Sequence, residues 1–294
     1  MFSAFEFSRV KQNMKLKMKH FLLFLFSFVP VFTLSAAPQV LNVEQDGIVG
    51  HYYQQPANSH KQPVIVLGGS EGGIPTKLAK VIAENGHPTL AVAYFKADTL
   101  PKELEKIPLA YFEKATAWLQ QKHPAQKHIT LVGWSKGAEL ALLIASRDTV
   151  FDRVIAIAPS SVVWAGILAD WQTVPGSSWS QNEKELPFVA FNPTGPVEGL
   201  LDLYSQSLEN RNDGGSATIP VENIRGNVVL YSGGMDEIWP SSSMAVSICQ
   251  RMTENQLSRC KRFNYPELDH LLNYKMLAPS EDLYKHFIRS VDGK

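Results

Sequence analysis

Short apolar runs alternate with amphipathic segments along most of this chain. The runs are rich in Val, Ile, Leu and Ala, and they lie in segments 63–73, 88–95, 128–132, 153–161, 227–240 and 259–270. Apolar residues fall at helical spacing in segments 74–86, 100–121, 136–146 and 280–291. Continuous apolar strands are typical of a parallel sheet that is covered on both faces. The pattern therefore predicts an α/β fold with a mostly parallel central sheet, preceded by an edge strand or hairpin at 47–56.

One long segment, 164–225, departs from this alternation. It is rich in Ser, Pro, Gly and Asn and has no sustained period. Irregular segments of this length are usually functional loops or caps. Its large aromatic residues suit an apolar ligand, or alternatively anchor the segment to the body: Trp164, Trp171, Trp179, Phe188 and Phe191. We interpret 164–225 as a cap inserted into a single catalytic domain, 37–294.

Residues 1–36 are typical of a secretory signal peptide. They hold a Lys-rich start, an apolar stretch at 21–32 and small residues up to a favoured cleavage site after Ala36. The apolar stretch is shorter than the ~20 residues that a membrane span needs, and Pro30 interrupts it; an uncleaved anchor is the alternative. We expect export to a periplasm or out of the cell, with no stable membrane span after cleavage.

The cysteine content fits an exported protein. Cys249 and Cys260 are the two cysteines of the chain, and both would enter an oxidising compartment. They can form a disulfide, and two buried free thiols are the alternative.

The charge balance excludes nucleic acid as an expected partner. Of 28 basic and 28 acidic residues, five basic and one acidic lie in the leader, which leaves 23 and 27, a formal charge of −4. The mature part has no Lys/Arg run. No cluster of Cys, His and carboxylates has metal-ligand spacing, so we expect neither a metal nor a cofactor.

The stretch "GWSKG" places Ser135 between two glycines, after a predicted strand and before a predicted helix. This Gly-x-Ser-x-Gly context is the nucleophile elbow of an α/β-hydrolase. A serine hydroxyl is a weak nucleophile until a base takes its proton, and the base needs a carboxylate to orient it. The motif alone can also be an ordinary turn, so later residues must supply the partners.

The partners occur in the order that this fold requires. Asp236 follows the strand in 227–240, and His270 follows the strand in 259–270. Glu237 is the neighbour that could be confused with the acid. His286, the other downstream histidine, lies in a predicted helix.

Two backbone amides should bind the oxyanion of a tetrahedral intermediate. We expect one from Lys136, directly after the serine, and one from Ser70 or Glu71 in the loop "GGSEGG". The alternative, a phosphate loop, lacks its terminal Gly-Lys-Ser/Thr. The Lys136 side chain is expected to be a solvated charge.

These residues resemble the C-terminal catalytic domain of the acyl-CoA thioesterases and bile acid-CoA:amino acid N-acyltransferases, which is dienelactone-hydrolase-like. The resemblance runs from Pro63 to Leu271 and is carried by "GGSEGG", "NGHPTLAVAYF", "LPKELEKIPLAYFEKATAWL", "GWSKGAELAL", "IPVENIRGNVVLYSGGMDEIWPS" and "YPELDH". It implies a triad at Ser135, Asp236 and His270. It also implies a small-molecule acyl thioester substrate, and a serine at 135 favours hydrolysis, because the dedicated transferase uses cysteine.

We therefore expect a serine hydrolase that cleaves an ester or thioester. A serine peptidase or amidase and an acyltransferase are alternatives within the same fold. A binding protein that has lost turnover is the alternative from another class.

Overall fold

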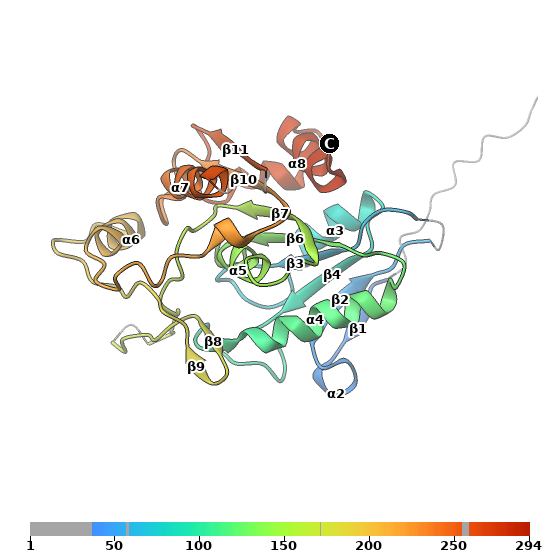
Figure 1. Ribbon diagram of the computed structural model, residues 1–294, viewed down its shortest axis with the longest axis horizontal. Coiled ribbons are helices and arrows are strands. Elements are labelled where there is room, and N and C mark those ends of the chain that lie inside the picture. Colours follow the sequence, from blue (N-terminus) through green and yellow to red (C-terminus); the bar gives the residue numbers. More distant parts are fainter. Residues whose placement is uncertain (1–36, 57–58, 171, 255–258) are drawn as a thin grey trace, which may run out of the picture. The chain divides into compact units, whose positions relative to one another are not determined.

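The computed structural model describes residues 37–56, 59–170, 172–254 and 259–294 (Figure 1). The expected signal peptide, 1–36, and Trp171 of the expected cap lie outside the described residues. Within the described ranges, no helix has the length and apolarity needed to cross a membrane.

The centre of the fold is an eight-stranded sheet in the order β1-β2-β4-β3-β6-β7-β10-β11. Its strands are β1 (Gln39–Leu41), β2 (Val49–Tyr53), β3 (Val64–Leu67), β4 (Thr89–Ala93), β6 (Ile129–Trp134), β7 (Phe151–Ile157), β10 (Asn227–Gly233) and β11 (Cys260–Tyr265). All neighbouring strands from β4 to β11 in this order are parallel, whereas β1 and β2 are antiparallel additions. The predicted α/β fold with a mostly parallel sheet is confirmed.

Of the two predictions for the N-terminal segment, an edge strand or a hairpin, the structure has the hairpin. β2 pairs with β4 on one side and with β1 on the other, so it is an interior strand and half of a hairpin. The edge belongs to β1, which is too short to produce a recognisable pattern in the sequence.

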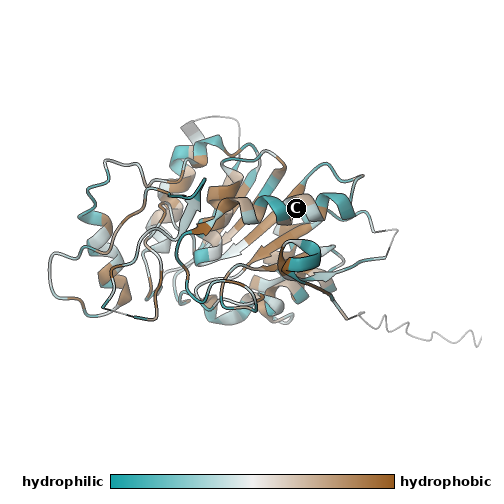
Figure 2. Cartoon of the chain, turned by 90° about the horizontal axis from the view of Figure 1, so that it is seen from below, coloured by the Kyte–Doolittle hydropathy of each residue, from teal (hydrophilic) through white to brown (hydrophobic). Residues whose placement is uncertain are grey.

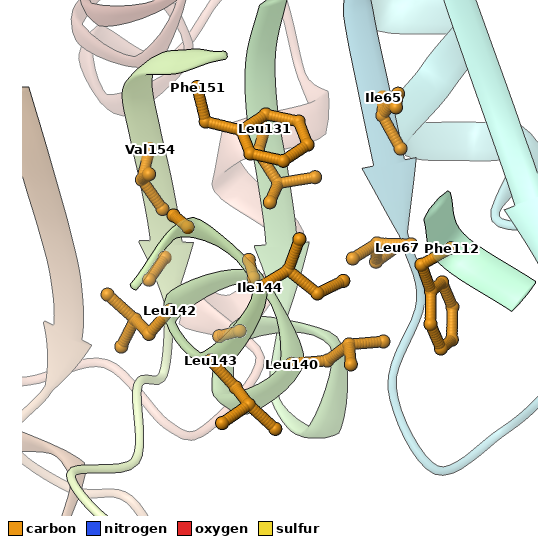
Figure 3. Packing of buried hydrophobic residues seen from close by; sticks show 14 of the residues in the cluster. Ile65, Leu67, Phe112, Leu131, Leu140, Leu142, Leu143, Ile144, Phe151 and Val154 are labelled. Atoms are coloured by element: carbon orange, nitrogen blue, oxygen red, sulfur yellow. The ribbon is translucent and has the colours of Figure 1, made fainter. Parts of the chain in front are cut away.

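Helices cover both faces of the sheet. On one face lie α4 (Leu109–Lys122), α5 (Lys136–Ala145) and α7 (Ser241–Glu254); on the other lie α3 (Thr76–Glu84) and α8 (Asp282–Asp292). Alternate residues of each strand contribute to the two cores, as when Ile65 packs toward the first group and Val66 toward the second. Figure 3 shows Leu131 and Phe151 of the sheet side by side, in the same cluster as Leu142 and Ile144 of α5. Figure 2 shows the resulting hydrophobic strands between helices with hydrophilic outer surfaces.

The predicted helix at 100–121 is shorter than expected and starts at Leu109. Ile107–Pro108 instead forms β5, which pairs with β8 (Trp179–Gln181) in a small sheet completed by β9 (Lys184–Glu185). Proline removes an amide donor and disfavours helical geometry in the residue before it. The apolar spacing of this segment was right from Leu109 onward, but Pro108 sets the helix start.

The segment 164–225 is only partly irregular, because it also contains α6 (Leu200–Glu209) in addition to β8 and β9. These elements lie at one end of the domain (Figure 1). Trp164 and Trp179 are fully buried, and Phe188 and Phe191 pack partly buried against cores. The aromatic residues of the segment that the structure describes therefore anchor it to the body. Phe191 both anchors the segment and lines a cavity described below, so it fits both of the roles expected for these aromatic residues.

Short elements complete the described chain: α2 (Val43–Asp46) and the 3₁₀ turns η1 (Val221–Asn223) and η2 (Leu272–Leu277). The sulfur atoms of Cys249 and Cys260 are bonded to each other, which joins α7 to the first residue of β11.

Candidate active site

Ser135 lies at the tight turn between β6 and α5. Its backbone has φ 55° and ψ −119°, a conformation that costs energy for any residue with a side chain. Gly133 and Gly137 make the turn sterically feasible. A Cβ on Gly133 would lie 2.0 Å from the Gly137 carbonyl oxygen, and one on Gly137 would lie 2.4 Å from the carbonyl oxygens of Leu67 and Gly68. The two glycines of the motif are therefore required by close backbone contacts around the serine.

The structure brings Ser135, His270 and Asp236 together. His270 Nε2 lies 2.8 Å from Ser135 Oγ, and His270 Nδ1 lies 2.8 and 2.9 Å from the two carboxylate oxygens of Asp236. The three side chains are buried, with exposed fractions of 8% or less. A hydrogen-bonded chain of this kind can take the proton of the serine hydroxyl onto an imidazole whose orientation a carboxylate holds.

Asp236 is held in place by its own loop. Its Oδ1 accepts hydrogen bonds from the amides of Ile238 and Trp239 at 3.0 and 3.1 Å, and its Oδ2 accepts one from the Ser241 hydroxyl. The Trp239 ring meets the His270 ring edge to face, with centroids 5.3 Å apart. These contacts fix the position of the carboxylate before any substrate binds.

Glycines also bring the loops after β10 and β11 together. A Cβ on Gly233 would lie 2.2 Å from the Asp269 carbonyl oxygen, and one on Gly234 would lie 2.5 Å from that of Pro266. This close approach places the loop carrying Asp236 against the loop carrying His270. The "SGGMD" sequence thus has a steric reason for both glycines.

Glu237 and His286, which could be confused with Asp236 and His270 in the sequence, occupy other positions. Glu237 is exposed and accepts the backbone amide of His270 at 3.2 Å, so it contacts the histidine only through the main chain. His286 lies in α8, where its ring packs against Phe263 at 4.0 Å and its Nδ1 pairs with the Tyr265 hydroxyl. Neither replaces Asp236 or His270.

The loop after β3 lies beside the serine. A Cβ on Gly69 would lie 3.1 Å from the Cβ of Ser135, and Ser70 and Glu71 line the same cavity as the serine. The Gly69 amide donates to the Glu71 carboxylate at 3.1 Å, which leaves the amides of Ser70 and Glu71 as the candidates from this loop. Lys136 begins α5, and the first amides of a helix have no partner within it.

The Lys136 side chain is buried and not solvated, which contradicts the prediction. Its ammonium forms a 2.6 Å ion pair with Glu139, and both side chains are at most 1% exposed. Burial lowers the pKa of Lys136 and raises that of Glu139, while the pair itself opposes both shifts. The sequence interpretation failed because Lys136 and Glu139 are one helical turn apart on the inner side of α5, where the cap segment covers them. Sequence reasoning missed Glu139, although the i, i+3 spacing of opposite charges was a signal.

A cavity of about 1000 Å³ opens beside Ser135. Its apolar lining comes from the end of β6, from α3 and the turn before it, from the cap segment and from the segments after β10 and β11. The lining includes Ile74, Leu78, Trp134, Ile167, Leu168, Val174, Phe191, Leu200, Leu203, Tyr204, Ile238, Trp239, Leu271, Tyr274 and Leu277. The size and lining suit a small molecule with an apolar part. Most of these residues were not predicted, but the spacing of Leu200, Leu203 and Tyr204 was a helical signal.

Comparison with known proteins gives a consistent result. A family model described as "BAAT / Acyl-CoA thioester hydrolase C terminal" matches residues 107–289. Acyl-coenzyme A thioesterase 6 of Mus musculus is 30% identical over 76% of this chain and 52% of its own length. Acyl-coenzyme A amino acid N-acyltransferase 1 of the same organism is 26% identical over 78% of this chain and 53% of its own length. The chain thus spans about half the length of these relatives.

Solved structures share the fold at low sequence identity. An esterase of Pyrococcus furiosus superposes with a TM-score of 0.53 at 12% identity, covering 83% of this chain and 86% of that one. An α/β-hydrolase enzyme from a Medee basin deep-sea metagenome library gives 0.51 at 14% identity, covering 87% and 98%. The shared fold is that of the α/β-hydrolases.

Proposed function

The chain belongs to the family of BAAT and acyl-CoA thioester hydrolase C-terminal domains, and from this premise we propose that it is a serine hydrolase that cleaves a carboxylic ester or thioester through an acyl-enzyme on Ser135. The observation that carries the proposal is the contact of His270 with both Ser135 Oγ and the Asp236 carboxylate. In this reaction His270 takes the hydroxyl proton as Ser135 attacks the carbonyl carbon, and then gives it to the leaving alcohol or thiol. Water, deprotonated by the same imidazole, releases the acid.

The oxyanion of each tetrahedral intermediate would be bound by backbone amides. The amide of Lys136 belongs to the first turn of α5, so the helix dipole adds to its effect. The second amide would come from Ser70 or Glu71, whose loop contacts the serine through Gly69. Loss of one such donor costs about 3 to 4 kcal/mol of barrier.

The cavity supports an apolar acyl group as the recognised part of the substrate. Thioesters of coenzyme A are candidates because the curated relatives are named for them, and uncharged esters are the other class. Hydrolysis is favoured over acyl transfer by the serine nucleophile.

Export is part of the proposal. It is motivated by the Lys-rich and apolar residues of 1–36, and it is supported by the Cys249–Cys260 disulfide, since such bonds persist in oxidising compartments. Processing at Ala36 would be detected by mass spectrometry of the protein recovered from each cell fraction, and an unprocessed chain in the cytosol would contradict it.

A fluorophosphonate probe tests the nucleophile directly. We expect labelling of the wild-type protein, its loss in Ser135→Ala, and its retention in Ser160→Ala, a matched variant at another buried serine whose hydroxyl only bonds within its own turn. A panel of p-nitrophenyl esters and acyl-CoAs of increasing chain length then identifies the acyl and leaving groups. Folded wild-type protein that neither reacts with the probe nor turns over any ester would favour a binding protein without catalysis.

A further inference from the structure

Glu139 occupies an unusual place for a carboxylate. It lies in α5, four residues after Ser135, with no exposed side-chain surface. Burial of an ion pair is costly, and well-packed apolar residues often replace such pairs without loss of stability. The Lys136–Glu139 pair therefore needs an explanation other than stability alone.

Glu139 connects the nucleophile helix to both ends of a loop in the cap segment. Its Oε1 accepts hydrogen bonds from the indole N–H of Trp179 at 2.7 Å and from the backbone N–H of Trp164 at 3.2 Å. Its Oε2 accepts a hydrogen bond from the ammonium of Lys136. A carboxylate can accept from all of these donors at once. One buried side chain thus holds two cap positions and the residue that follows the nucleophile.

Residues 164–167 and 176–179 are paired across the base of this loop. The Gly166 amide donates to the Gly176 carbonyl at 2.7 Å, and the Ser178 hydroxyl donates to the carbonyls of Trp164 and Ala165. Part of the cavity wall comes from Ile167 at this base and from Leu168, Val174 and Pro175 beyond it. Holding the base at Glu139 therefore fixes where this wall lies relative to Ser135.

We infer that Glu139 is a positioning residue that sets the acyl-chain preference of the cavity by anchoring the cap residues 166–170 and 172–175 to the nucleophile helix. The inference rests on the proposed function. Lys136 pairs with Glu139 inside the protein, and its own amide lies beside the nucleophile. The ion pair thus ties the wall that contacts the acyl chain to the element that carries the reacting oxygen.

Two double variants separate the anchor from the charge. Lys136→Met/Glu139→Gln removes both charges but keeps an acceptor oxygen for Trp179 and Trp164, whereas Lys136→Met/Glu139→Leu removes the acceptor as well. The measurement is kcat/KM for decanoyl and acetyl p-nitrophenyl esters, with enzyme concentration taken from fluorophosphonate-titrated sites. We expect the decanoyl-to-acetyl ratio to stay within about threefold of wild type in the Gln variant. We expect it to fall by about tenfold or more in the Leu variant, mainly through KM for the long ester, as is typical of lost pocket contacts.

Trp179→Phe provides a milder test in case a double variant does not fold. It removes only the indole donor and should change the ratio in the same direction. Asp292→Asn is the control for general destabilisation, because Asp292 pairs with Lys61 and His87 away from the lining of the cavity; its ratio should equal that of wild type.

The outcomes distinguish this inference from the proposed function. Equal ratios in wild type, the Leu double variant and Trp179→Phe, all with titratable sites, would overturn the positioning role and leave the hydrolase intact. A shift of the same size in the Gln and Leu double variants would assign the effect to charge and also overturn the anchor. Wild-type protein without titratable sites would overturn the proposed function itself.

Discussion

Replacing Gly137 by alanine should slow the enzyme although it improves the helix propensity of α5. In an unobstructed helix this change would stabilise the fold by up to about 1 kcal/mol. Here the new Cβ would lie 2.4 Å from the carbonyl oxygens of Leu67 and Gly68, whereas contacts under 3.0 Å are essentially never seen. Both obstacles are main-chain atoms at the end of β3, so no side chain can rotate away.

Relief of this contact requires a shift of about 0.6 Å or more between the start of α5 and the end of β3. That shift moves Ser135 and the Lys136 amide relative to the loop "GGSEGG", which contributes the other side of the site. Since a displacement of about 1 Å can cost on the order of 100-fold in rate, we expect kcat to fall by about 10- to 100-fold. Strain of this kind also lowers the free energy of unfolding by about 1 to 3 kcal/mol.

The assay is steady-state hydrolysis of a p-nitrophenyl ester, together with urea unfolding followed by circular dichroism. Gly195→Ala is the matched control, because a Cβ there meets only the Gln206 side-chain oxygen at 3.6 Å, an ordinary contact. A Gly137→Ala protein with kcat within threefold of wild type and undiminished stability would refute the steric account of the motif.

Three further predictions concern the Asp236 carboxylate, the Cys249–Cys260 disulfide and the stability of the fold at low pH. Asp236→Asn should lower kcat by about 10³- to 10⁴-fold, by analogy with a serine protease in which the same change leaves the histidine in the wrong tautomer; circular dichroism should confirm that the fold is retained. Cys249→Ser/Cys260→Ser should lower the free energy of unfolding by about 3 kcal/mol in the chain-entropy model for a closed loop of this length, and an unchanged urea midpoint would contradict it. Burial lowers the pKa of His87 in the folded protein below its usual 6.5. As the pH falls, this histidine is therefore protonated in the unfolded chain before it is protonated in the folded protein, so the free energy of unfolding should fall as the pH drops below about 6.5. His87→Asn should flatten the dependence of Tm on pH between about 7 and 5.

The partner of His87, Asp292, should make a second contribution to the loss of stability at lower pH. Burial opposes the ionisation of Asp292, but hydrogen bonds from Lys61 and His87 outweigh it and lower the pKa of Asp292 to about 2. A depressed carboxyl pKa stabilises the fold at pH values above the unfolded value of about 3.9, and this contribution disappears as the pH falls toward 2.

The sequence was sufficient for the parts of the fold that depend on local pattern. The strands β3, β4 and β6 are buried along their whole length because both faces of the sheet are covered there, and their sequences are correspondingly apolar. The edge strand β11 is half-exposed and mixes polar with apolar residues. β1 has only three residues, and the start of α4 depends on Pro108, so neither position follows from apolar spacing alone. In each case a local steric or pairing effect decided the outcome.

The order and spacing of Ser135, Asp236 and His270 predicted which side chains meet, because a parallel sheet brings its carboxyl ends to one edge. The buried state of Lys136 could not be predicted in the same way. It depends on Trp164 and Trp179, which come from a segment without a sustained period and reach α5 only through tertiary packing. Sequence spacing indicates that Lys136 and Glu139 can pair, but only the covering segment removes them from water.

The reacting side chains and the cavity wall should therefore respond differently to mutation. Ser135, Asp236 and His270 lie on loops whose close main-chain contacts only glycine permits at positions 133, 137 and 233, so we expect substitutions there to change the rate for every substrate together. Part of the cavity wall comes from side chains of the cap segment, and Glu139 of α5 is hydrogen-bonded to the base of that part through Trp164 and Trp179. Changes at the anchor should consequently alter which acyl chain is preferred while the reacting groups stay in place. Mutations in the cap can then change which substrate is preferred while the turn that carries Ser135 keeps its structure. The ratio of long-chain to short-chain turnover measures that change in preference.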